Sequence, residues 1–142
     1  MILVVDTNVV VSALLSPRGA PGRVLDLVLG RALDLAVDDR ILAEYRAVLT
    51  RARVGFDPAD VEALMAFLIS TAITALARPL STRLPDEADE AFLEVAIAAR
   101  ADALVTGNLR HYPVADRAGV HVMSPAEFIA QMRARPTPDR QA

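Results

Sequence analysis

Short aliphatic segments alternate with amphipathic segments along this 142-residue chain, and this alternation restricts its possible folds more than any other feature. Residues 2–5 and 103–106 contain only aliphatic side chains and one threonine, which is typical of strands buried on both faces of a parallel sheet. Residues 33–37, 72–77 and 120–123 are expected to form three further strands. Since helical segments separate the strands, the sequence predicts an α/β fold: a three-layer α/β/α sandwich around a five-stranded parallel sheet.

Helices are expected between the strands, and several begin with a recognisable capping pattern. Ser124 and Glu127 have the spacing of a capping box, and Asp86 follows a proline as a helix N-cap. One sheet with its helices accounts for residues 1–133, so a single domain is predicted, and residues 134–142 are expected to form a flexible tail. The expected helices cover residues 9–15, 23–32, 40–51, 58–69, 86–100 and 125–133.

The composition excludes several classes of protein. Without cysteine, the chain has no disulfides, no thiol catalysis and no cysteine-bound zinc. All 15 basic residues are arginine, and the lack of lysine excludes P-loop NTPases, Schiff-base enzymes and receiver domains. A net charge of −3 and 4% aromatic residues argue against nucleic-acid binding through bulk positive charge or base stacking. No apolar run reaches about 18 residues, so we expect a cytoplasmic protein that does not enter the membrane.

Polar residues follow two of the predicted strands directly. Asp6 comes after the first strand, and Asn108 follows residues 103–106. Ligands of parallel sheets bind beyond the carboxyl ends of the strands, which makes both positions candidates for a functional site. An ordinary helix N-cap explains Asp6 about equally well, because aspartate is a preferred residue at that position.

Helical geometry separates the acidic residues of two predicted helices. At about 100° per residue, Glu44 lies on the flank of its helix, roughly 90° from the centre of the apolar face, where exposure is the commoner outcome. Asp89 falls within the apolar stripe of its helix, and an unpaired buried charge is costly, so a partner or a cation is expected. The other acids of that helix are expected on its outer, solvated face: Glu87, Glu90 and Glu94.

A metal site follows if Asp6, Glu44 and Asp89 converge in the folded chain. Three carboxylates about 5 Å apart repel one another by roughly 3 kcal/mol per pair at an effective dielectric constant of about 20. Such a cluster requires a cation or raised pKa values. Oxygen ligands without cysteine or clustered histidine favour Mg²⁺ or Mn²⁺ over Zn²⁺, and either ion is suited to promoting attack by water on a phosphate.

Four short motifs, in this order and on these elements, resemble the PIN-domain nucleases: residues 6–8 (DTN), 44–45 (EY), 85–94 (PDEADEAFLE) and 105–108 (VTGN). Within that family the chain is most similar to the VapC-like toxins of bacterial toxin–antitoxin systems. The resemblance covers about residues 1–130. It implies a five-stranded parallel sheet of order 3-2-1-4-5 and Mg²⁺- or Mn²⁺-dependent cleavage of RNA.

The resemblance also implies roles for individual residues. Asp6, Glu44 and Asp89 match the metal-binding acids of the family. Asn108 stands where a fourth acid is common; its amide still fits a catalytic role, but it supplies no charge to hold a second metal. His111 replaces another acid found in many relatives. Further residues near the expected site are candidates for substrate binding: Asn8, Arg18, Arg23, Thr106, Arg110 and His111.

Two functions remain open on this basis. One is a metal-dependent endoribonuclease that acts as a toxin. The other is a catalytically weak PIN fold that binds RNA or a protein, and Asn108 is the reason to consider it. A haloacid-dehalogenase phosphatase is disfavoured, because Asn8 stands where that chemistry requires a second aspartate and the required lysine is absent.

Two protein partners are expected. The resemblance implies a small antitoxin protein, a segment of which covers the acidic groove. A homodimer is predicted because the helices at residues 40–51 and 58–69 carry more apolar side chains than one sheet face readily covers, and exposed apolar area commonly marks an interface. The apolar residues in question are Tyr45, Val48, Leu64, Met65, Phe67 and Leu68.

Overall fold

A computed structural model describes residues 1–134 and contains one parallel sheet of order β3-β2-β1-β4-β5. In the centre, Leu3 of β1 lies opposite Leu35 of β2 on one side and Ala103 of β4 on the other. The predicted α/β fold and strand order are therefore confirmed. The strands are β1 (Ile2–Val5), β2 (Asp34–Val37), β3 (Ile73–Thr74), β4 (Ala103–Val105) and β5 (Val122–Met123).

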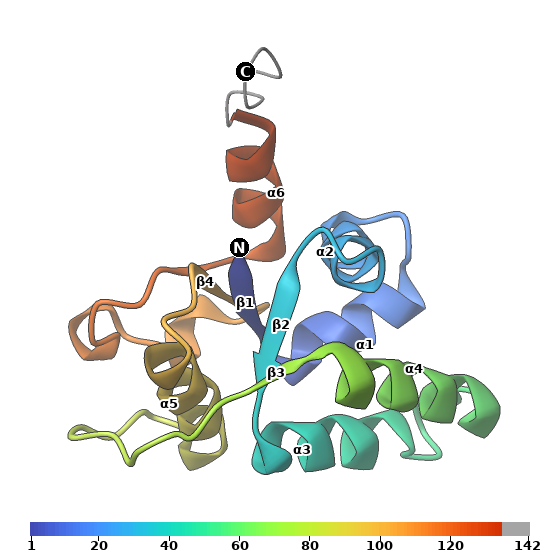
Figure 1. Cartoon of the computed structure of the whole chain (residues 1–142), viewed down its shortest axis with the longest axis horizontal. Coiled ribbons are helices and arrows are strands. Elements are labelled where there is room, and N and C mark those ends of the chain that lie inside the picture. Colours follow the sequence, from blue (N-terminus) through green and yellow to red (C-terminus); the bar gives the residue numbers. More distant parts are fainter. Residues whose placement is uncertain (135–142) are drawn as a thin grey trace.

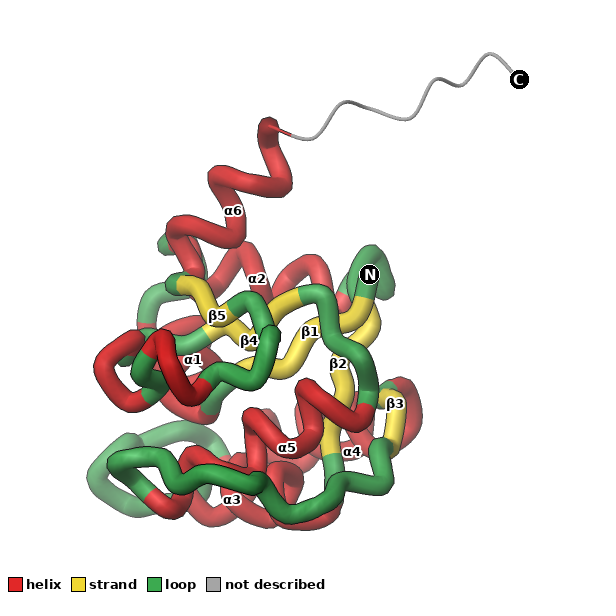
Figure 2. The backbone as a smooth tube through the Cα atoms, turned by 90° about the vertical axis from the view of Figure 1, so that its left-hand side faces the viewer, coloured by secondary structure: helices red, strands yellow, loops and turns green. Residues whose placement is uncertain are grey.

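Helices cover both faces of the sheet (Figure 1). Within the described residues they are α1 (Thr7–Leu15), α2 (Ala20–Leu29), α3 (Asp39–Leu49), α4 (Pro58–Thr71), α5 (Glu90–Ala98) and α6 (Pro125–Ala134), with three short 3-10 helices, η1 (Glu87–Asp89), η2 (Leu109–His111) and η3 (Val114–Asp116). Helix α5 packs across β1, β2 and β4, on the opposite side from α1 and α2. Helix α6 contacts α2 and extends away from the sheet (Figure 2).

The C-terminal end of the chain differs slightly from the expected boundary. Ala134 belongs to helix α6 and not to the predicted tail. The rest of the predicted tail, residues 135–142, lies outside the described residues. None of the helices formed by residues 1–134 is long and apolar enough to cross a membrane.

Strand β3 and helix α2 differ in their bounds from their predicted counterparts. Strand β3 covers only two residues of the predicted 72–77 strand, and both are exposed, because it lies at the edge of the sheet with one neighbouring strand.

Helix α2 begins three residues earlier than predicted, and its first turn packs tightly against the preceding loop. A Cβ on Gly22 would lie 2.0 Å from the carbonyl oxygen of Pro17, so only glycine fits there.

The segment that opens α5 is a 3-10 turn, which alters the surroundings of its acidic residues. Asp86 caps this turn by accepting a hydrogen bond from the N–H of Ala88 at 2.9 Å, as expected of an N-cap. Helix α5 itself begins at Glu90, so Asp89 occupies its N-cap position. Asp89 is buried as predicted, with 7% of its surface exposed.

The prediction that Glu90 and Glu94 face solvent is wrong. The segment at residues 78–85 crosses this side of α5 and buries both carboxylates, which are 7% and 8% exposed. Glu90 accepts a hydrogen bond from the N–H of Leu84 at 2.9 Å, and Glu94 accepts one from the N–H of Leu80 at 3.0 Å. The carboxylates serve as acceptors for backbone groups that have no partner strand or helix. Glu87 is exposed, as predicted.

Most of the apolar residues on which the homodimer prediction was based are buried inside the monomer. Tyr45, Leu64, Met65 and Leu68 are buried, because α3 and α4 pack against each other and both contact β2. This part of the argument for a dimer does not hold, although dimerisation itself remains a prediction.

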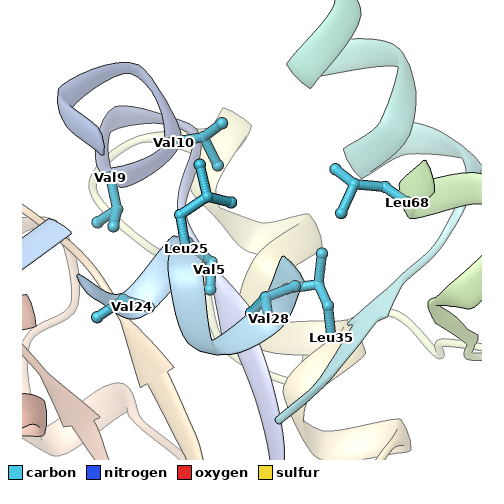
Figure 3. Close-up of a pocket in the computed structure, with 8 residues that line it drawn as sticks. All are labelled: Val5, Val9, Val10, Val24, Leu25, Val28, Leu35 and Leu68. Carbon is cyan, nitrogen blue, oxygen red and sulfur yellow. The ribbon is translucent and has the colours of Figure 1, made fainter. Parts of the chain in front are cut away.

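The interior contains one small apolar void that is unsuited to ligand binding. Side chains from α1, α2 and α4 meet Val5 and Leu35 of the sheet around it (Figure 3). Its volume is about 10 Å³ and its lining is aliphatic, so neither its size nor its chemistry fits a ligand. The polar groups at the strand ends are better candidates for a functional site.

Candidate active site

Asp6 stands at the carboxyl end of the central strand, and its carboxylate does not cap the helix that follows it. Oδ2 of Asp6 instead accepts hydrogen bonds from Oγ1 of Thr106 at 2.9 Å and from the hydroxyl of Tyr112 at 3.0 Å. Asp6 is only 4% exposed. Burial raises the pKa of Asp6, and the two hydroxyl hydrogen bonds partly oppose that rise. A simple capping role therefore does not explain this residue.

Glu44 is held close to Asp6 by a neighbouring hydroxyl group. Oε2 of Glu44 accepts a hydrogen bond from Oγ1 of Thr7, the first residue of α1. Glu44 is half-buried, which agrees with the flank position expected from helical geometry.

Asp89 is the third acid of the site, and it contacts His111. Its Oδ2 lies 2.8 Å from Nδ1 of His111, and Nε2 of that ring lies 2.8 Å from Nδ2 of Asn108. Burial and, next, the charge of Asp6 raise the pKa of Asp89 to about 6, whereas the charge of His111 acts to lower it.

The three carboxylates act together on one buried hydroxyl group. The pKa of Tyr112 is raised well above its usual value, first by burial and then by the charges of Asp6, Asp89 and Glu44. Asp6 directly follows strand β1, Glu44 belongs to helix α3 and Asp89 ends the η1 turn. Asp6, Glu44 and Asp89 therefore all influence Tyr112 electrostatically, whereas their action as one set of metal ligands remains a prediction.

The chemistry of this site fits a hard divalent cation. One ligand atom each from Asp86, Asp89 and His111 lie within 4.8 Å of one another. Oδ2 of Asp89 is buried and accepts no well-aligned hydrogen bond from any residue between 1 and 134, so its charge calls for a protonated imidazole or a cation. This close cluster shares only Asp89 with the ligand set expected from the sequence, Asp6, Glu44 and Asp89.

The polar residues predicted to bind substrate have different surroundings. Asn8 is exposed and accepts a hydrogen bond from the N–H of Gly107 at 2.9 Å, which ties α1 to the end of β4. Thr106 is fully buried, so its hydroxyl contacts Asp6 and the N–H of Asn108 and has no surface that a substrate can reach.

The arginines predicted to bind substrate are all exposed, but they lie in different places. Arg110 is part of η2 and directly precedes His111, the residue that contacts Asp89. Arg23 lines a groove between α2 and α6 together with Arg133. Within residues 1–134, no hydrogen bond or ion pair connects Arg18 or Arg23 to the acidic cluster.

A groove of about 440 Å³ adjoins Glu44. It runs between the start of α3, the crossing segment at residues 78–85 and the first turns of α5. Its charged lining residues are Arg40, Arg83, Glu44, Glu87, Glu90 and Glu94. Four carboxylates against two guanidinium groups make the groove acidic on balance.

Sequence reasoning missed Tyr112, Thr7 and the contribution of Asp86 to a metal cluster. A buried tyrosine hydroxyl requires a hydrogen-bond partner, but its partner here lies 106 positions earlier in the chain. Asp86 was assigned only a capping role, which it also fulfils. The order of the motifs predicted that the acids lie close together. No local sequence pattern indicated which uncharged groups form hydrogen bonds with them.

Residues 2–110 match the PIN domain family, and this chain therefore belongs to that family. Two solved structures share its fold. The crystal structure of VapBC2 from Rickettsia felis, bound to a DNA fragment from its promoter, has a TM-score of 0.61 and 19% sequence identity, covering 87% of this chain and 98% of that chain. FitAcB from Neisseria gonorrhoeae has a TM-score of 0.55 and 17% identity, covering 89% and 99% respectively. No curated protein matches the sequence significantly.

Proposed function

We propose that this chain is a Mg²⁺- or Mn²⁺-dependent endoribonuclease that acts as the toxin of a toxin–antitoxin system. The proposal is supported by the PIN-domain match and by the charges of Asp6, Glu44 and Asp89, which all raise the pKa of the buried Tyr112 hydroxyl. Two of these carboxylates are buried with raised pKa values, and such an arrangement is stabilised when a cation binds the charged forms.

The residues of the site divide into ligands and supporting groups. Asp6 and Asp89 would hold the metal, with Glu44 and Asp86 as further oxygen donors. When bound, Mg²⁺ or Mn²⁺ supplies the positive charge that polarises a phosphodiester and promotes attack by water. Asn108 donates toward His111, which adjoins Asp89.

The proposed substrate and protein partner follow from the charge of the residues around the site and from similarity to PIN-domain proteins. RNA is the substrate that the resemblance to PIN-domain nucleases implies. Arg110, which is exposed and precedes His111 in sequence, is the arginine that we propose to bind a phosphate. The acidic groove next to Glu44 favours a basic segment of an antitoxin, because an arginine there would form paired hydrogen bonds with carboxylates. The named complexes VapBC2 and FitAcB support such a partner. We further propose that the protein is a homodimer in the cytoplasm.

Cleavage of mixed single-stranded RNA by the purified full chain tests the reaction. We expect cleavage with MgCl₂ or MnCl₂, none with EDTA, and none from Asp6→Asn with either metal. Asp60→Asn, which removes an exposed carboxylate from α4, is expected to retain wild-type activity. Cleavage in EDTA, or by Asp6→Asn at the wild-type rate, contradicts the proposal. RNA binding without cleavage in any metal supports the binding module instead.

Thermal unfolding of the same variant provides a second, independent measurement. In EDTA, Asp6→Asn is expected to melt higher than wild type, because it removes a buried charge that lies near two others. Its stabilisation by Mn²⁺ is expected to shrink, since a ligand at about 100 times its Kd adds about 2.7 kcal/mol only where it binds. For a chain of this size, each kcal/mol shifts Tm by roughly 2–4 °C. Tm values equal to those of wild type, both in EDTA and in Mn²⁺, would contradict a metal site at Asp6.

A further inference from the structure

Both hydroxyl groups that hold Asp6 come from one short segment after β4, residues 106–112. Oγ1 of Thr106 and the hydroxyl of Tyr112 donate to the same oxygen atom, Oδ2, at 2.9 and 3.0 Å. Neither hydrogen bond involves Oδ1. These two hydrogen bonds hold the carboxylate through Oδ2, and the backbone N–H of Thr7 also faces the carboxylate.

Tyr112 is well suited to this task because it is a permanent donor in a fixed position. Its side chain is fully buried, and its ring cannot move without disturbing the core. Its hydroxyl faces a carboxylate oxygen, which can only accept, so Tyr112 is the donor of this hydrogen bond. The same segment brings His111 to Asp89, so residues 106–112 contact acids from two different elements.

We propose that Tyr112 is a positioning residue for the metal site: with Thr106, it fixes the orientation of the Asp6 carboxylate through Oδ2, and this orientation favours binding of a divalent cation. This inference rests on the proposed function, because it assumes a metal at Asp6. Groups that orient a ligand in this way commonly change metal affinity by about 10–100-fold when they are removed.

The variant Tyr112→Phe removes only the hydroxyl group. We expect its Kd for Mn²⁺, measured by isothermal titration calorimetry on the full chain, to rise by about 10–100-fold. We expect kcat for RNA cleavage at fixed, subsaturating Mn²⁺ to fall, with KM for RNA unchanged. A structural contribution alone would lower the metal-free Tm and leave both the Kd for Mn²⁺ and kcat as they are.

Tyr45→Phe is the matched control. Tyr45 is the other tyrosine of the chain and is equally buried, but its hydroxyl donates to the backbone carbonyl of Val5 and not to a carboxylate. We expect this variant to lose stability from the missing hydrogen bond and to bind Mn²⁺ with wild-type affinity. Thr106→Val removes the other hydroxyl at Asp6 and is expected to weaken Mn²⁺ binding in the same direction, which allows a decision even if Tyr112→Phe does not fold.

If Tyr112→Phe binds Mn²⁺ with wild-type affinity, the inference is overturned. If that variant does not fold, wild-type affinity in Thr106→Val overturns it instead. Equal weakening in Tyr112→Phe and Tyr45→Phe also overturns it, because the cause is then general packing. If wild type itself binds no Mn²⁺, this inference and the proposed function both fail. If wild type binds Mn²⁺ but cleaves no RNA, the proposed function fails alone, and weaker binding by Tyr112→Phe still supports the positioning role.

Discussion

The carboxyl group of Asp89 couples the stability of this protein to pH. Its pKa is about 6 in the folded chain, against 3.8 for an unperturbed aspartate, because burial and the charge of Asp6 both disfavour ionisation. Between these two values the folded state binds more protons than the unfolded state. The free energy of unfolding in the absence of metal therefore decreases as pH rises from about 4 to about 6, and this contribution is constant above that range.

Asp89→Asn is expected to remove this pH dependence. In EDTA, the Tm of wild type relative to the variant should fall between pH 4 and pH 6 and then stay level. With saturating Mn²⁺ the order should reverse above pH 6, since a cation stabilises the charged form that only wild type has. Thermal melts at half-unit pH intervals measure both effects, with Asp60→Asn as a control expected to run parallel to wild type. Parallel curves for Asp89→Asn and wild type in EDTA would contradict the assignment of this pKa to Asp89.

At the scale of elements, helix α5 holds the segment at residues 78–85 through two buried glutamates. Glu94 connects three parts of the chain: it accepts from the N–H of Leu80 at 3.0 Å and from Arg40 of α3 at 2.7 Å. Arg40 also pairs with Asp38 at 2.7 Å. Because the crossing segment forms one wall of the acidic groove, the shape of the groove depends on this connection.

Glu94→Gln is expected to destabilise the fold by about 1–3 kcal/mol, because the new amide places a donor against the guanidinium of Arg40 and leaves a buried polar group unsatisfied. Urea unfolding measures the change. The control is Glu62→Gln, which breaks an exposed ion pair with Arg46 at 3.4 Å and is expected to cost at most about 0.5 kcal/mol. Equal effects of the two substitutions would show that the buried carboxylate contributes no more than a surface one.

At the scale of the whole molecule, the exposed apolar residues that remain lie partly along one edge of the sheet. Strand β3 has no neighbour on its outer side, and Ile69 and Leu76, on either side of it in sequence, are 54% and 94% exposed. Unpaired strand edges and exposed apolar side chains both favour association.

We therefore expect a homodimer, with light scattering at micromolar concentration giving twice the 15.2 kDa mass of one chain. Leu76→Asp is expected to shift the equilibrium toward monomer, because it places a charge in the proposed interface. Val114→Asp is the control, since Val114 is also strongly exposed but belongs to η3. A monodisperse species of 15.2 kDa for wild type would contradict the prediction, and equal responses of both variants would place the interface elsewhere.

The sequence by itself determined the approximate positions of the strands, their α/β arrangement and the three candidate acids. These features depend on local patterns, because a run such as residues 2–5 is buried on both faces in almost any parallel sheet. Capping is equally local: Asp86 and Ser124 accept the backbone hydrogen bonds that their positions predict. The inward position of Asp89 followed from helical periodicity, although a 3-10 turn replaced the first helical turn.

Only the tertiary structure decided which groups surround those acids. Glu90 and Glu94 have the periodicity of an outer face, yet a segment that crosses above them buries both. No local feature of the sequence indicates the hydrogen-bond partner of Tyr112. Arg23 lies in the segment after the first strand, but its side chain lines a groove together with residues of α6. The physical reason is that periodicity records which side of an element is apolar, whereas the partner of a polar side chain depends on where distant segments pass, and that course is set by the packing of the whole chain.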